Sequence, residues 1–301
     1  MTASTRERYR TLSIECEDDA GMSTIVDKKP KKFKKFHIER FDSAMEMAQT
    51  CKTRPITDSR FDDKSKETFG SFEGVSTYQE ALDLLNGGYQ PTVDAMRGVF
   101  KAGVQGSGNR FAFQNSVVGF APVVPLALKN VPNSMIGMTM KPIKCKVVDV
   151  YYDMTCSCGT DSKDIIEAGR KLLSAVIELE RQGYRFNLYA VQGYNDNTGC
   201  DMAVVKVKSA TQPLDLKRIS FPLTHTAFFR VIGFDWYSKV PGGKYRGGYG
   251  HALAYDYNNE QMQELGKELF GANAIFFTAV GIMKKDTDHI KEVVTNGKGK
   301  N

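Results

Sequence analysis

A short polar stretch, VVDVYYDMTCSCGTDSKDI, contains the residue types that carry chemistry in proteins. Its apolar beginning ends at Asp153, and two hydroxyl side chains, Thr155 and Ser157, follow at alternating positions. A carboxylate and two hydroxyls spaced in this way can point in the same direction, and such hard oxygen ligands suit Mg²⁺, Mn²⁺ or Ca²⁺. Two cysteines alternate with them, so a thiol site is a second interpretation, and a strand that leads into a capped helix is the third.

The thiols of this stretch are weaker candidates than its oxygens. Cys156 and Cys158 form a C-x-C pair, whereas structural zinc usually needs a second pair and the remaining cysteines are single. Six cysteines are also too sparse for a disulfide framework in a chain of 301 residues. We therefore expect the oxygens to carry any chemistry at this position.

The rest of the sequence offers little enzyme chemistry. The four histidines are scattered, and none has the H-x-x-x-H or H-E-x-x-H spacing of a zinc hydrolase. The loop GVQGSGN matches neither a dinucleotide fingerprint nor a Walker loop, and no nucleophile elbow is present. We therefore expect a protein without enzymatic activity.

Two basic segments could contact nucleic acid, and the net charge of +6 is compatible with an anionic partner. The run KKPKKFKKF could contact phosphates and stack on bases, although a solvated linker is the plainer interpretation. The glycine-rich loop KVPGGKYRGGYGHAL combines arginine with tyrosine, which suits single-stranded nucleic acid, and a flexible rim loop is its plainer interpretation. The candidate nucleic-acid-binding residues are Lys28, Lys29, Lys31, Lys32, Lys34, Lys35, Lys244, Tyr245, Arg246 and Tyr249.

The elements that would position these residues alternate between strands and helices from residue 144 onward. The apolar patterns predict strands over residues 144–154, 184–194, 201–210, 251–257 and 273–283. They predict helices over residues 162–183 and 258–271, and a helix broken at Pro222 over residues 214–240. Such alternation predicts an α/β fold with a mostly parallel, Rossmann-like central sheet flanked by helices, and a hairpin-like turn over 195–199. In such sheets ligands bind beyond the carboxyl ends of the strands, where we expect Asp153.

The first half of the chain has a different pattern. We expect a flexible basic arm over residues 1–35 and a small, mainly helical N-terminal region over 36–143, followed by the α/β domain over 144–301. The N-terminal region ends in a proline-rich connector, SVVGFAPVVPLALKNVPNSMIGM, whose prolines favour short strands and turns. Apolar segments of this kind usually pack against another element or serve as a protein contact.

The element Asp153-Met-Thr155-Cys-Ser157, between a strand and a long helix, resembles the D-x-[ST]-x-S element of von Willebrand factor A-type domains. The order of elements over about residues 144–290 is also similar to that family. The resemblance implies a metal-ion-dependent adhesion site that holds Mg²⁺ or Mn²⁺ and receives a carboxylate from a protein partner. In that family a later threonine and a later aspartate complete the site. The implied metal ligands are Asp153, Thr155, Ser157, Thr224, Thr226 and Asp256, with either threonine as the later hydroxyl.

The whole chain is similar to uncharacterised proteins encoded by tailed phages and mobile elements. We therefore expect a non-enzymatic binding or assembly protein with a protein partner, and the alternatives are a nucleic-acid-binding protein and a virion structural component. No apolar run is long enough to span a bilayer, and the polar beginning, MTASTRERYRTLSIECEDD, is not a secretory signal. These features predict a cytoplasmic protein, or a virion component, without a membrane partner.

Overall fold

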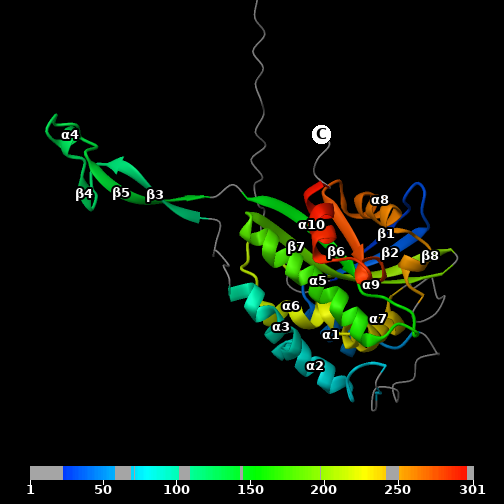
Figure 1. Ribbon diagram of the computed structural model, residues 1–301. Helices are drawn as coiled ribbons and strands as arrows, with labels where there is room; N and C mark the ends of the chain where they lie inside the picture. Colours follow the sequence, from blue (N-terminus) through cyan, green and yellow to red (C-terminus); the bar gives the residue numbers. More distant parts are fainter. Residues whose placement is uncertain are drawn as a thin grey trace, which may run out of the picture.

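The computed structural model describes residues 23–57, 69–70, 72–101, 109–142, 145–196, 198–241 and 251–296. Its centre is a six-stranded mixed sheet in the order β1-β2-β8-β7-β6-β9 (Figure 1). The strands are β1 (Thr24–Lys28), β2 (Lys35–Phe41), β6 (Lys146–Asp153), β7 (Tyr184–Asn195), β8 (Gly199–Lys208) and β9 (Ala274–Thr278). The pairs β2–β8, β6–β7 and β6–β9 are parallel, and the other two pairs are antiparallel. The predicted α/β class with a mostly parallel sheet is confirmed.

Helices cover both faces of this sheet, and the alternation of side chains along β6 defines the faces. Val148, Val150 and Tyr152 point into the larger core, which they share with α5. Tyr151 points into a smaller core, which it shares with α8. The helices that contribute buried residues to the larger core are α1 (Ala44–Thr53), α2 (Tyr78–Gly87), α3 (Gln90–Lys101), α5 (Ser162–Arg181), α6 (Leu216–Thr224), η2 (Phe228–Gly233), α7 (Phe234–Lys239), α9 (Ala279–Met283) and α10 (Thr287–Asn296). The other face carries α8 (Asn259–Phe270) and the short helix η3 (Leu253–Tyr255).

Local sequence explains why α5 begins and ends where it does. The side chain of Asp161 accepts a hydrogen bond from the backbone of Lys163 at the N-terminus. Gly183 then adopts a left-handed φ of 90°, which turns the chain from the helix into β7. Within the helix, Gly169 lies so close to the carbonyl of Leu223 in α6 that a Cβ atom would collide with it. The two helices therefore pack closely because this position has no side chain.

The hairpin predicted between the second and third strands of the α/β region is confirmed. β7 and β8 are antiparallel neighbours, with Asn195 opposite Cys200 at the turn. The carboxylate of Asp196 accepts hydrogen bonds from the backbone of Thr198 and Gly199 and so fixes the turn.

The beginning of the chain differs from the prediction of a helical N-terminal region. The described chain starts with β1 and β2, and β2 joins the central sheet beside β8. Residues 24–28, which lie in the segment expected to be a basic arm, form β1. The lysines obscured this strand pair, because β1 is an edge strand whose side chains are mostly exposed. Phe36 and Ile38 nevertheless alternate into the smaller core.

The predicted strand over residues 251–257 is also wrong. Residues 253–255 form η3, in which Asp256 donates its backbone N–H to the carbonyl of Leu253. Only the start of the predicted strand 273–283 lies in the sheet. β9 ends at Thr278, because the side chain of Thr278 caps α9 by accepting a hydrogen bond from Gly281. The helix predicted over residues 214–240 is interrupted after Thr224 and not at Pro222, which lies inside α6, and helical structure resumes as η2 and α7.

A second, smaller sheet is built from the proline-rich connector and the residues before it. It is antiparallel, in the order β3-β5-β4, and Figure 1 shows it standing away from the rest of the described chain. Its elements are β3 (Asn109–Ser116), β4 (Ala121–Pro122), β5 (Met135–Pro142) and the short helix α4 (Val124–Ala127). We call residues 109–142 the projecting sheet. No described helix is both long enough and apolar enough to span a lipid bilayer.

Candidate functional site

Asp153 lies at the carboxyl end of β6, where the order of the strands reverses. From β6 the chain passes through α5 to β7 on one side, whereas β9 lies on the other side and follows α8. α5 and α8 cover opposite faces of the sheet. Crevices that bind ligands in α/β sheets form where connections diverge in this way. The position predicted for Asp153 therefore agrees with the topology.

The two carboxyl oxygens of Asp153 have different surroundings. Oδ1 accepts hydrogen bonds from the backbone N–H of Thr155 at 3.0 Å, from its hydroxyl at 2.7 Å and from the Gly193 N–H at 3.4 Å. Oδ2 is buried and has no hydrogen-bond partner among the described residues. Burial raises the pKa of Asp153 to about 7, against the hydrogen bonds from Thr155 and Gly193, which lower it. A buried carboxyl with one unpaired oxygen is stabilised by a proton or by a cation.

The loop after Asp153 is held in place from both sides. The backbone N–H of Ser157 donates to the Tyr255 hydroxyl at 3.0 Å, and the Ser157 hydroxyl lies 3.4 Å from that of Thr160. On the other side the buried guanidinium of Arg230 donates to the Thr160 carbonyl and to the Ser162 hydroxyl, both at 3.0 Å. Ser157 is half-buried, so the loop presents one hydroxyl to its surroundings beside the enclosed Asp153.

The two threonines predicted as later metal ligands have other hydrogen-bond partners. The Thr224 hydroxyl donates to the Ser220 carbonyl at 2.7 Å, as a helical side chain often does. The Thr226 hydroxyl donates to the Glu73 carbonyl at 3.1 Å and ties the residues between α6 and η2 to the segment before α2. Both side chains are fully buried. In this structure they serve packing between elements.

Asp256, the remaining predicted ligand, belongs to a polar cluster at the end of the hairpin. Its Oδ2 lies 2.6 Å from the Lys34 ammonium and accepts a hydrogen bond from the Asn195 amide. Partial burial acts to raise the pKa of Asp256, but hydrogen bonds from Lys34 and Asn195 lower it below its usual range. The structure thus joins Asp153 to Thr155, keeps Ser157 on the same loop and gives the other three predicted ligands different partners. No group of three or more His, Cys, Asp or Glu side chains within the described ranges could hold a metal ion.

The cysteines of the loop do not form a reactive pair. Cys156 is buried, and burial raises the pKa of its thiol to about 12. Cys158 is exposed, so the two side chains lie in different surroundings. A thiol this far from its thiolate form is a poor nucleophile and a poor metal ligand. The oxygens therefore remain the better candidates for chemistry.

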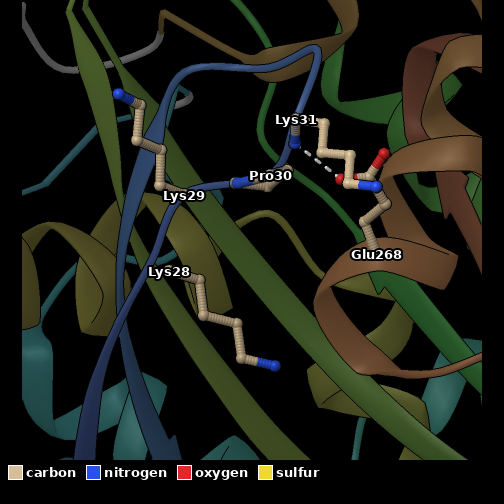
Figure 2. A pocket seen from close by; sticks show the side chains of 5 residues that line it. All are labelled: Lys28, Lys29, Pro30, Lys31 and Glu268. Atoms are coloured by element: carbon tan, nitrogen blue, oxygen red, sulfur yellow. Dashed lines mark hydrogen bonds between the residues drawn. The ribbon is translucent and has the colours of Figure 1, made fainter.

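The lysine-rich segment forms the turn between β1 and β2, and much of it is bound to α8. The backbone N–H of Lys31 donates to Glu268 at 2.8 Å, and the Lys32 ammonium lies 2.7 Å from Glu264. Lys28 donates to the carbonyl of Leu269. Figure 2 shows the hollow beside this turn, about 450 Å³ in volume, with the Lys29 side chain directed away from α8. It is lined by Lys28, Lys29, Pro30, Lys31 and Glu268.

Of the other predicted nucleic-acid-binding residues, two are described by the structure and four are not. Lys34 is paired with Asp256, and Lys35 begins β2 with its side chain exposed. Lys244, Tyr245, Arg246 and Tyr249 lie outside the described residues. The turn therefore supplies the described part of the predicted basic surface.

A buried polar network on the larger-core side was not anticipated from the sequence. Glu39 on β2 is fully buried and accepts two hydrogen bonds from Arg54, at 2.6 and 2.9 Å, and one from the Trp236 indole at 2.7 Å. Although burial acts to raise it, the pKa of Glu39 is lowered by hydrogen bonds from Arg54, Ser23 and Trp236. A glutamate within a strand gives no local signal of burial, because its partners are distant in the sequence. The network joins β2 to α1 and α7.

The comparisons with known proteins give one match. Residues 23–295 match the model of a family described as a domain of unknown function, DUF7192. No curated protein and no solved structure matches the chain. The matched range contains both sheets and the Asp153 loop, and it crosses the domain boundaries expected at residues 35 and 143.

Proposed function

The chain belongs to the DUF7192 family, and we propose that it is a non-enzymatic binding protein whose partner docks at the carboxyl end of β6. The observation that carries the proposal is the buried Oδ2 of Asp153, which has no hydrogen-bond partner among the described residues. Leaving such an oxygen unpaired costs about 1–3 kcal/mol or more, so a bound group that satisfies it would stabilise the fold.

A von Willebrand A-like architecture is part of this proposal. The order β6, α5, the β7–β8 hairpin, α6, α8 and β9 follows the order of elements on which the resemblance rests, apart from the missing strand at 251–257. Asp153 ends β6, and Thr155 and Ser157 lie in the loop between β6 and α5, as the resemblance requires. The direct hydrogen bond between the first two supports a shared role.

Mg²⁺ or Mn²⁺ is the cation that this loop would hold. Asp153 would supply Oδ2, and the hydroxyls of Thr155 and Ser157 would supply neutral oxygens, a donor set that hard divalent ions accept. When bound, the ion would supply positive charge to which a carboxylate of the partner could bind. Thr224, Thr226 and Asp256 remain predicted ligands, and each would have to exchange its present partner to contribute.

Calorimetric titration with MgCl₂ and with MnCl₂ tests the proposal. We expect binding heat for the wild type and for Asp164→Asn, a control that removes an exposed carboxylate from the first turn of α5. Asp153→Asn and Asp153→Ala should both abolish it, and circular dichroism of each variant checks that it folds. Heat that is absent from the wild type, or unchanged in both Asp153 variants, would refute the metal site.

Nucleic acid is a second candidate partner, because three lysines and a single glutamate line the hollow at the β1–β2 turn. Of the three lysines that line the hollow, Lys29 and Lys31 have exposed side chains that could contact phosphates. Fluorescence anisotropy with single-stranded DNA and RNA at two salt concentrations tests this. We expect tight binding only at low salt. Lys29→Glu with Lys31→Glu should weaken it, whereas Lys163→Glu, an exposed lysine on α5, should not. Affinity indifferent to salt and to these substitutions rules out this partner.

A further inference from the structure

The projecting sheet exposes a large apolar surface. Phe113 is 68% exposed, and Val118 and Leu128 are each 80% exposed. Soluble monomers rarely present this many apolar side chains within one short segment. The exposed large apolar side chains of the projecting sheet are Phe113, Val117, Val118, Phe120, Val124, Leu128, Val131 and Met138.

One face of the projecting sheet is apolar, and the strand register shows which one. Phe113 on β3 lies directly opposite Met138 on β5, so both side chains point to the same face. Phe120 packs its ring edge against Phe113, with centroids 5.8 Å apart, and extends this face. The neighbouring positions, which point the other way, pair Gln114 with Gly137. The sheet is therefore two-sided, with an aromatic face and a face of small and polar residues.

A sheet of this size needs a cover. The projecting sheet consists of two longer strands, β3 and β5, and the two-residue strand β4. A sheet this small is marginally stable in water unless its apolar face is buried. Figure 1 shows no element of the described chain over it. The rest of the described chain offers no comparable apolar surface, because its exposed large apolar side chains are Ile25, Val26, Val147 and Tyr255. Within the described residues the projecting sheet therefore has no cover, and another molecule can supply one.

We propose that the cover is a second copy of this chain, and that two projecting sheets stack face to face across a two-fold axis. Between residues 112 and 139 the sequence contains a single charged residue, Lys129. A two-fold contact brings like residues of the two copies together, so a surface almost without charge suits self-association. It also lacks the charges by which a different protein would be selected.

The size of the surface agrees with a dimer. The eight exposed side chains come from the strands and from the segments between them, and together they present on the order of 800 Å². One partner in a standard interface buries about 800 Å². The apolar faces of two projecting sheets would pack about 10 Å apart, like the sheets of a β-sandwich. The proposal rests on the projecting sheet alone and is independent of the Asp153 loop.

Sedimentation velocity of the full chain over a wide concentration range tests the proposal. The wild type should be a dimer, and Phe113→Lys, at the centre of the apolar face, should raise the dimer dissociation constant by at least about tenfold. Gln114→Lys is the matched control, because it adds the same charge to the same strand on the opposite face. It should leave the dimer intact.

A second variant guards against a folding defect in the first. Met138→Lys places a charge opposite position 113, so it should weaken the dimer to a similar extent, and circular dichroism checks that both variants fold. Dimers unaffected by both substitutions, or weakened equally by Gln114→Lys, would overturn the proposal. A wild type that stays monomeric would also overturn it. Flotation of such a monomer with neutral phosphatidylcholine vesicles, lost in Phe113→Lys, would assign the surface to a lipid instead.

Discussion

Replacing Asp153 with asparagine should expose a pH dependence of stability that the wild-type protein conceals. Burial raises the pKa of Asp153 from 3.8 to about 7. A carboxyl group with a raised pKa in the folded state contributes stability that is fully present below its unfolded pKa and lost as the pH rises towards 7. A difference of about three in pKa corresponds to about 4 kcal/mol of unfolding free energy.

His225 acts in the opposite direction over nearly the same range. Burial lowers its pKa from 6.5 to about 4, and the nearby Glu80 opposes that shift only in part. The His225 ring contacts the Tyr89 ring edge-on and stacks on the Phe221 ring. Its Nδ1 accepts a hydrogen bond from the Ala227 N–H. The stability that neutral His225 contributes is present above pH 6.5 and lost as the pH falls through 4. It amounts to about 3 kcal/mol.

The two contributions should cancel to within about 1 kcal/mol between pH 4 and 7 in the wild type. Asp153→Asn removes the contribution of Asp153, so the unfolding free energy of this variant relative to the wild type should rise by about 4 kcal/mol as the pH rises from 4 to 7. His225→Gln removes the contribution of His225, so the unfolding free energy of this variant relative to the wild type should fall by about 3 kcal/mol as the pH rises from 4 to 7. Each variant is compared with the wild type at the same pH, because the other carboxyl groups titrate in both proteins and their effect cancels in the difference.

Urea unfolding at closely spaced pH values, in buffer containing a chelator, measures these differences. Asp164→Asn, which removes an exposed carboxylate, is the control and should follow the wild type closely. A gap between the wild type and Asp153→Asn that does not change with pH would refute the reasoning. Repeating the series with Mg²⁺ adds a link to the proposed function. A bound cation favours the carboxylate, so the contribution of Asp153 should no longer fall between pH 4 and 7.

Two further substitutions test how the fold is held together. Arg54→Ala leaves the fully buried Glu39 without its cation and should cost about 3–5 kcal/mol in urea unfolding. Adding Glu39→Gln should recover part of that loss, and a purely additive double variant would count against the pairing. Gly169→Ala should cost about 1–3 kcal/mol, because its Cβ would meet the Leu223 carbonyl. Gly98→Ala, in open space on α3, should instead stabilise by about 0.5–1 kcal/mol, and equal effects at both glycines would contradict the close packing.

Local signals were sufficient for the elements that the sequence predicted well. The long apolar stripe of α5 and the turn-forming residues of the β7–β8 hairpin depend on neighbours in the sequence, so both were predicted. β2 depends on pairing with β8, about 160 residues further along the chain, and β1 depends on pairing with β2. The lysines of this strand pair mimic a linker. The segment 251–257 alternates like a strand, but it packs Leu253 into the smaller core as a helical turn.

The candidate site was predictable only where its residues are close in sequence. The spacing of Asp153 and Thr155 placed them together, and the structure joins them by a hydrogen bond. The roles of Thr226 and Asp256 depend on partners far away in the sequence, because Thr226 donates to Glu73 and Asp256 pairs with Lys34. No local sequence pattern reveals these partners. The unpaired Oδ2 of Asp153 is likewise a property of tertiary burial, which the sequence pattern does not reveal, although Asp153 itself was expected at the end of its strand and does end β6.

The positions of the two proposed surfaces allow both to be occupied at once. The projecting sheet ends at Pro142 and joins the body at Lys146, the amino end of β6, whereas Asp153 lies at its carboxyl end. Eight residues of extended strand separate the two ends by about 25 Å. A dimer built through the projecting sheets would therefore leave the Asp153 loops open to a partner. Phe113→Lys should then leave the heat of Mg²⁺ binding unchanged, and Asp153→Asn should leave the dimer intact. If either substitution changed both properties, the two surfaces would be coupled and this separation would be wrong.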